Sequence, residues 1–291
     1  MDMVDTHPHV ISDDPEKYPI SPLGGVRSGW SADRPITTEQ FIEYMDGAGV
    51  QQAALVQAST AHGYDNSYAA DSVAKYPDRF VGVCCVDAAA RDGAEKLRYW
   101  IQDRGMSGVR LFTAGSTMNE TDWLDKDDAH PFWLEAARLD VPVCVQIRRT
   151  GTHMLVNVLK RYPNVRMLLD HFSHPLLEDG PPYSQASAFF DLAQYPNLYL
   201  KFSTRNITEA KEGKSTVEAF FGKVVEAFGA NRVMWGSNFP GTWGKGPAGP
   251  YKELADLARE ELKVLGEENQ RWLLAETARS VYPKLAPVKA G

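Results

Sequence analysis

The sequence predicts a single (β/α)8 barrel, the TIM-barrel fold. Three observations carry this prediction: apolar runs of strand length occur eight times, segments of helical periodicity separate them, and each strand–helix unit takes roughly 30 residues. A chain of 291 residues is long enough for one large domain or two ordinary ones. Because eight such units make a barrel of typical length, we expect one domain over residues 1–291, with residues 286–291 as a loose tail.

Each predicted strand is a short run rich in apolar and β-branched residues. In chain order these runs cover residues 3–10, 53–59, 80–86, 108–112, 141–147, 165–170, 198–203 and 232–237.

The segments between the strands have helix length, and their apolar residues recur at spacings of three and four. Two further segments of this kind follow the last strand. The predicted helices cover residues 38–48, 66–76, 91–103, 131–139, 152–161, 185–194, 215–228, 251–264 and 268–280.

The connections differ at the two ends of the strands. Segments leading from a helix back to a strand are short, and three of them stop the helix with Tyr-Pro: 75–80, 161–166 and 194–199. In this fold the loops that leave the strands build the active site. We therefore expect the chemistry at the carboxyl ends of the strands, where the connections are long and irregular: 11–36, 113–130, 171–184 and 238–250.

The composition limits the classes of function. Lys and Arg number 31 against 38 Asp and Glu, so the net charge is −7, and without a basic run we expect no nucleic-acid partner. No stretch approaches the roughly 20 apolar residues of a membrane span, and the first residues, MDMVDTHPHV, lack the basic start and the apolar stretch of a signal peptide. We expect a soluble, cytoplasmic protein with no membrane partner, in which Cys84, Cys85 and Cys144 are buried and reduced.

Four residues at predicted strand ends are candidates for catalysis. His7 and His9 are two apart on the first strand, so both side chains leave one face and suit a shared metal ion or a shared water. A structural role for this pair is the alternative, and Asp5 is a candidate partner behind it. His171 directly follows the sixth strand. Asn238 follows the eighth, and its amide cannot accept a proton at neutral pH.

Several arginines are placed near strand ends. Arg110 lies in the fourth strand, Arg148 ends the fifth, and Arg205 follows the seventh, which also contains Lys201. A charge that points into a barrel is costly unless it is paired, and guanidinium groups match carboxylates. Any one of these groups could instead be solvated, but their convergence at the mouth of an acidic protein indicates a small anionic substrate, for which we expect a carboxylate.

Other polar and aromatic residues occupy the same end of the predicted barrel. Gln57 and Ser59 end the second strand, and Gln146 lies on the fifth. His174 is in the loop after the sixth strand, where loop packing is an equal alternative to substrate contact. Tryptophans in or beside these segments could wall a pocket, with core packing the default for the third of them: Trp30, Trp123, Trp235 and Trp243.

Five ordered segments resemble the amidohydrolase-related (amidohydrolase 2) family, nearest the branch of 2-pyrone-4,6-dicarboxylate lactonase: DTHPHV, VQASTAHGYDN, GMSGVRLF, LLDH and RVMWGSNFP. The resemblance implies a catalytic centre at His7, His9 and His171, with Arg110 holding a substrate carboxylate. It also implies two modes of action, since the lactonase uses an aspartate after the eighth strand and no metal, whereas decarboxylases of the family bind one divalent ion. This chain departs at Asn238, in place of that aspartate, and at Gln146.

From these residues and the resemblance, we expect a hydrolase that opens a lactone carrying a carboxylate or similar anion. Water attacks the ring carbonyl, activated either by a neutral histidine or by Zn²⁺ or Mn²⁺ held by His7, His9 and His171. No cofactor is the expectation we favour. The alternatives are a metal-dependent decarboxylase or hydratase of an aromatic or unsaturated acid, a cyclic amide hydrolase, and a binding protein that lost catalysis with its carboxylate. Homo-oligomerisation is left open.

Overall fold

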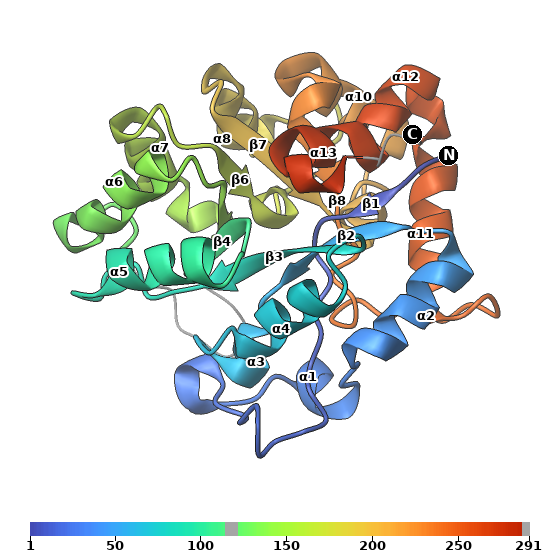
Figure 1. Ribbon diagram of the computed structural model, residues 1–291. Helices are drawn as coiled ribbons and strands as arrows, with labels where there is room; N and C mark the ends of the chain where they lie inside the picture. The colour runs from blue at the N-terminus through green and yellow to red at the C-terminus, as the bar shows by residue number, and fades with distance from the viewer. Residues whose placement is uncertain (114–121, 287–291) are drawn as a thin grey trace.

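Eight parallel strands form the barrel that the sequence predicts. The computed structural model describes residues 1–113 and 122–286, and the strands pair in chain order from the first to the eighth (Figure 1). The amide of Thr6 donates to the carbonyl oxygen of Trp235 at 3.2 Å, which joins the last strand to the first. The strands are β1 (Val4–Asp5), β2 (Gln52–Val56), β3 (Phe80–Cys85), β4 (Gly108–Phe112), β5 (Val143–Gln146), β6 (Met167–Leu169), β7 (Leu198–Phe202) and β8 (Val233–Trp235).

The helices lie outside the barrel and largely follow the predicted ranges (Figure 1). Predicted helix 91–103 continues from α5 as a wider π-helical turn, Tyr99–Asp103, and predicted helix 185–194 is broken into short turns around α8. The helices are α1 (Gly29–Asp33), α2 (Thr38–Ala48), α3 (Ser59–His62), α4 (Ser67–Lys75), α5 (Gly93–Arg98), α6 (His130–Arg138), α7 (Thr152–Arg161), α8 (Ser187–Phe190), α9 (Thr204–Glu209), α10 (Val217–Phe228), α11 (Pro250–Glu261), α12 (Glu267–Arg271) and α13 (Thr277–Val281).

The first strand is shorter than predicted, so His7 and His9 lie beyond it. Pro8 has no N–H for a ladder, but its carbonyl oxygen accepts from the amide of Val56 at 2.9 Å. The amide of His9 donates to the carbonyl of Phe239 at 2.8 Å. The segment therefore still runs between β2 and the loop after β8, where both imidazoles are at the carboxyl end of the barrel.

The barrel is apolar at one end and polar at the other. Its interior is packed with small and branched side chains, among them Val4, Val83 and Cys144, and Tyr282 after α13 joins the same cluster. The three cysteines are buried and unbridged, as expected. Residues 287–291 of the predicted tail and 114–121 of the predicted loop 113–130 lie outside the described residues. In the described part, no helix has both the length and the apolarity that crossing a bilayer requires.

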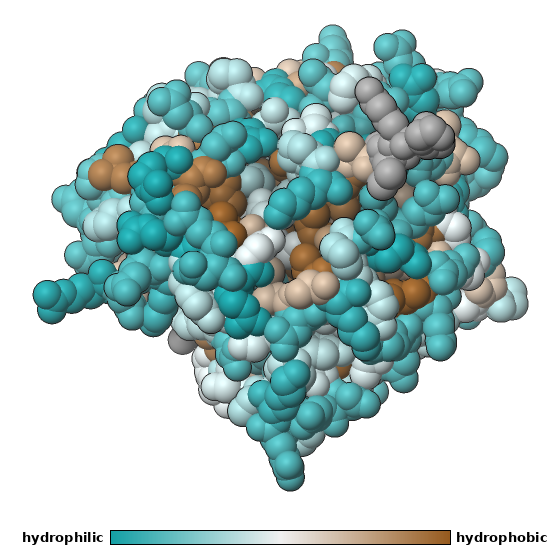
Figure 2. Space-filling view, in the orientation of Figure 1, coloured by the Kyte–Doolittle hydropathy of each residue, from teal (hydrophilic) through white to brown (hydrophobic). Residues whose placement is uncertain are grey.

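The outer surface in this orientation is mostly hydrophilic. Figure 2 shows hydrophobic side chains in separate areas between polar ones. Apolar side chains gather instead between the strands and the helices, where Phe41, Trp133 and Phe220 are fully buried. This layer fixes the strands, and the strand ends position the polar groups described next.

Candidate active site

A cavity of about 150 Å³ opens among the strand ends and the loops that follow them. Its lining combines imidazole, amide, hydroxyl and guanidinium groups with two aromatic rings. The lining residues are His9, Trp30, Ser59, Thr60, Arg110, Phe112, Gln146, His171 and Asn238. Six predicted site residues are thus brought together from six different segments of the chain.

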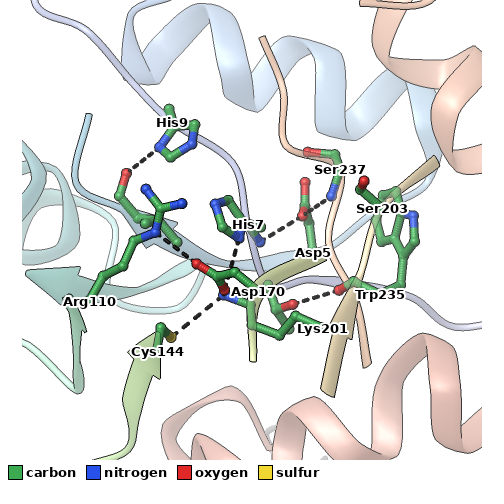
Figure 3. Close-up of polar contacts among 12 residues, drawn as sticks. Asp5, His7, His9, Arg110, Cys144, Asp170, Lys201, Ser203, Trp235 and Ser237 are labelled. Carbon is green, nitrogen blue, oxygen red and sulfur yellow. Dashed lines mark hydrogen bonds and ion pairs between the residues drawn. The ribbon is translucent and has the colours of Figure 1, made fainter. Parts of the chain in front are cut away.

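Asp170, directly after β6, is the charged centre beneath this cavity (Figure 3). One of its oxygens accepts from Arg110 Nε at 2.8 Å, and the other lies 3.4 Å from Lys201 Nζ. His7 Nδ1 is 3.5 Å from that second oxygen. Burial opposes ionisation of Asp170, but Lys201, His7 and Arg110 together hold its pKa well below the usual range. One carboxylate therefore faces two buried cations.

His9 presents one defined nitrogen to the cavity. Its Nδ1 is 2.8 Å from the carbonyl oxygen of Val56, which can only accept, so Nδ1 carries the proton and Nε2 carries the lone pair. The ring stacks on Trp30, with centroids 5.2 Å apart. Burial and the charge of Arg110 lower the pKa of His9 to about 3, so the ring is neutral at ordinary pH.

His7 lies between the other two histidines. Its ring centroid is 5.1 Å from that of His9 and 4.8 Å from that of His171. The absence of a side chain at Gly236 leaves room for His7, because a Cβ at position 236 would lie 2.5 Å from the Cβ of His7. Asp5 accepts from the backbone amide of His7 at 3.0 Å, so it holds the chain rather than the ring. Burial and the charge of Lys201 lower the pKa of His7.

His171 stands on a left-handed turn. The φ angles of residues 171–174 are 54°, 54°, 59° and 53°, a run that L residues rarely adopt. Three contacts of its side chains and backbone help to hold the turn: Phe172 packs among the aromatic rings of the core, Asn206 Nδ2 donates to the carbonyl of His171 at 3.0 Å, and Ser173 Oγ donates to the carbonyl of Ile147 at 2.9 Å. Burial is the main cause that lowers the pKa of His171 to about 3. The cavity is therefore lined by neutral imidazoles.

Asn238 lies in the cavity wall with a positive φ of 54°. Its Nδ2 donates to Thr242 Oγ1 at 3.3 Å, which holds the amide within the loop after β8. The lining residues named above include no carboxylate. Among the described lining residues, the groups that can accept a proton as a base are the imidazoles of His9 and His171.

The arrangement does not fit a resident metal ion. Three neutral imidazoles are donors that Zn²⁺ accepts, and both ring nitrogens of His7 are buried without a hydrogen-bond partner. Within residues 1–113 and 122–286, however, no group of three or more His, Cys, Asp or Glu side chains is arranged to hold a metal. Arg110 and Lys201 already form ion pairs with Asp170, and both cations would repel a divalent ion.

Four predicted substrate-binding residues do not line the cavity. Gln57 Nε2 donates to the carbonyls of Gly63 and Asp65, so this amide holds the loop after α3. Arg148 is exposed. Arg205 Nε donates to Glu209 at 2.7 Å, and His174 Nδ1 is 3.3 Å from the same oxygen. His174 nevertheless stacks on His171, with centroids 5.7 Å apart.

The sequence pattern predicts no role for Asp170 and places Lys201 only among the cations expected near the strand ends. A signal for Lys201 was present, because in the strand LYLKFS it alternates with Leu200 and Phe202 and so faces the barrel interior. Asp170 adjoins His171 at a strand end, a position where a carboxylate is costly unless it is paired. Of the four tryptophans, Trp30 lines the cavity, while Trp235 is fully buried as expected and Trp123 and Trp243 pack against the core.

Comparison with known proteins identifies the family of this chain. The amidohydrolase family model matches residues 4–284. The chain is 27% identical to D-galactarolactone isomerase of Agrobacterium fabrum over 99% of its length and 92% of that protein. It is 26% identical to L-fucono-1,5-lactonase of Burkholderia ambifaria over 70% of each chain.

Solved structures share the fold. One is described as a probable 2-pyrone-4,6-dicarboxylic acid hydrolase from Acinetobacter baumannii, with a TM-score of 0.75, 19% identity, and coverage of 97% of this chain and 100% of that one. Another is an amidohydrolase of Burkholderia multivorans with zinc bound, with a TM-score of 0.73, 20% identity, and coverage of 97% and 99%. The predicted family and the predicted enzyme class, a hydrolase, are confirmed. This chain belongs to the amidohydrolase family.

Proposed function

We propose that this enzyme hydrolyses a lactone that carries a carboxylate group. The observation that carries the proposal is the position of Arg110, whose Nε is held by Asp170 while its guanidinium group lines the cavity. Figure 3 shows the end of this group pointing toward His7 and His9. A guanidinium held in this way is preorganised to pair with a carboxylate.

The relatives support a lactone and differ in its charge. By their names, one acts on L-fucono-1,5-lactone, which is neutral, and the other on D-galactarolactone, which carries a carboxylate. A neutral sugar lactone has no charged group that would pair with Arg110. The buried cation therefore favours the anionic class for this chain.

Ring opening can be carried by protein groups alone. His9 Nε2 accepts a proton from water as the water oxygen bonds to the ring carbonyl carbon, and the amide of Asn238, which lines the cavity, donates to the developing oxyanion. The ring C–O bond then breaks, and the proton passes to the departing oxygen. The substrate carboxylate offsets the charge of Arg110, which otherwise lowers the pKa of His9, so the base strengthens when substrate binds.

A second reaction has support of its own. No carboxylate base lines the described cavity, and the relative that aligns with nearly the whole chain is named an isomerase. In an isomerisation, a hydroxyl of the substrate attacks the carbonyl in place of water, and one lactone ring replaces another. Product analysis by NMR in ¹⁸O-enriched water separates the two reactions, since only hydrolysis yields an open acid labelled with ¹⁸O.

The test compares carboxylated lactones with wild type, Arg110→Gln and Arg110→Lys. Losing the partner of a buried carboxylate costs about 3 kcal/mol, so kcat/KM of Arg110→Gln should fall about 100-fold. Arg161→Gln, which removes an exposed arginine paired with Asp127, should leave kcat/KM unchanged. Unchanged kinetics in Arg110→Gln would refute the proposed anion contact.

Metal content is measured on the same preparations. We expect full activity after treatment with a chelator, because the reaction above needs only protein groups. A stoichiometric divalent ion whose removal abolishes turnover would refute the metal-free reaction and favour the metal-dependent hydrolase or decarboxylase that the sequence left open.

A further inference from the structure

We propose that Lys201 sets the charge preference of the cavity: by balancing Asp170 from behind, it leaves Arg110 available, so the site selects lactones with a single negative charge over neutral ones. This inference rests on the proposed function and names its substrate class more narrowly. Lys201 acts through Asp170 and is therefore a positioning residue rather than a catalytic one.

The geometry separates Lys201 from the substrate. Its side chain is 1% exposed and does not belong to the cavity lining. Its ammonium group lies 3.4 Å from Asp170 Oδ1, on the side of the carboxylate not used by Arg110. The other neighbour of the ammonium group is Cys144 Sγ at 3.6 Å, at the edge of the apolar barrel interior.

The three buried charges that form ion pairs beneath the cavity do not cancel. In the described part of the chain, the buried acidic and basic residues other than histidine are Asp5, Arg110, Glu135, Asp170 and Lys201. Glu135 lies on α6 and pairs with two arginines at the surface. Asp5 is a separate charge: its oxygens accept from the amides of His7 and Ser237 and from the Tyr251 hydroxyl, and in the described part of the chain no ion pair joins it to Arg110 or Lys201.

The ion-paired cluster of Arg110, Asp170 and Lys201 has one excess positive charge. Arg110 and Lys201 contribute two, and Asp170 contributes one of opposite sign. An uncompensated charge in a poorly solvated interior is unfavourable, and one bound anion removes that cost. If position 201 were neutral, Asp170 and Arg110 would cancel, and a neutral substrate would bind as well as an anion.

The cavity also has a matching cation for only one negative charge among its described lining residues. Arg110 is the cation among its described lining residues, and the cavity measures about 150 Å³. Arg205, which follows β7, lies outside and is paired with Glu209. A second carboxylate on the substrate would find no matching cation in the described lining.

The test uses two lactones that differ only in whether they carry a carboxylate. Galactaro-1,5-lactone carries a carboxylate where galactono-1,5-lactone carries a hydroxymethyl group. We expect wild type to favour the anionic lactone in kcat/KM, and Lys201→Gln, which keeps a hydrogen-bond donor toward Asp170 but no charge, to lower that preference about tenfold. Lys201→Arg should restore it. Lys263→Gln makes the same change in net charge at an exposed position and should leave the preference unchanged.

Each other outcome is decisive. An equal loss for both lactones in Lys201→Gln would assign Lys201 a structural role and overturn the inference, as would an unchanged ratio or a wild type without the preference. If Lys201→Gln does not fold, Lys201→Met replaces it, and its ratio of kcat/KM values for the two lactones is compared with that of wild type. If wild type opens neither lactone, the proposed function fails, but calorimetric binding of galacturonate against galactose still decides the role of Lys201.

Discussion

Asn206 ties the left-handed turn of His171 to helix α9, and its replacement by alanine tests how that turn is held. The side chain is 1% exposed. Its Nδ2 donates to the carbonyl of His171 at 3.0 Å and to Glu209 Oε2 at 3.1 Å. Its Oδ1 accepts from the amide of Ser203 at 2.9 Å, in the capping box of α9.

The expected loss of stability is about 3 kcal/mol. The Asn206→Ala variant leaves the buried Ser203 amide without a partner. It also removes one of the two bonds to the His171 carbonyl, which still accepts from the His174 amide, and each loss costs about 1 to 1.5 kcal/mol. The bond to Glu209 adds less, because Arg205 still pairs with that carboxylate. For a chain of 291 residues, with an unfolding entropy of about 2.1 cal/mol/K per residue, the midpoint of thermal unfolding falls by about 5 °C.

The assay combines urea unfolding with steady-state kinetics on a carboxylated lactone. Because His171 loses its anchor, kcat should fall at least about tenfold at temperatures where the variant is fully folded. Asn157→Ala removes an exposed amide bonded to Asp125 and should cost less than about 0.5 kcal/mol. The reasoning is refuted if Asn206→Ala costs under about 1 kcal/mol or matches Asn157→Ala.

Three further outcomes follow from the site. Gly236→Ala places a Cβ 2.5 Å from that of His7, so we expect a loss of about 2 kcal/mol and of most activity, whereas Gly222→Ala, whose added Cβ meets nothing within 4 Å, should retain both. His9→Gln removes the nitrogen that faces the cavity, and turnover should fall about 1,000-fold; near-normal rates would exclude His9 as the base. Since the pKa values of His9 and His171 are about 3 in the folded state, only the unfolded state gains protons below about pH 6.5. The free energy of unfolding should therefore fall as the pH drops from 6.5 toward 3, and urea midpoints that stay constant between pH 7 and pH 5 would contradict this.

Much of the fold was predictable because its signals are local. The ranges of α2 and α7 match the predicted helices 38–48 and 152–161, and β4 matches the predicted strand 108–112. The limits of β1 were not predictable in this way. The run 3–10 looks continuous, but its backbone bonds beyond Asp5 go to Trp235 in β8, to Val56 in β2 and to Phe239 in the loop after β8, which closure of the barrel brings close.

The candidate site was predictable where it depends on strand order. Parallel strands place their carboxyl ends together, so residues such as His9 and His171 were expected to meet. The same rule could not place Gln57, because its amide could face either the cavity or the next loop. The hydrogen bonds that the Gln57 amide donates to the carbonyls of Gly63 and Asp65 depend on the path of that loop.

By itself, the sequence predicted the barrel, the end of it where the candidate site lies, and the histidines and arginine that line the cavity there, because periodicity and strand order are local properties of the sequence. The tertiary structure alone decided the charge of the site. Asp170 meets Arg110 across 60 residues of chain, and Lys201 reaches it from the next strand. Such pairings depend on distances of a few ångströms between side chains, and only closure of the ring sets those distances.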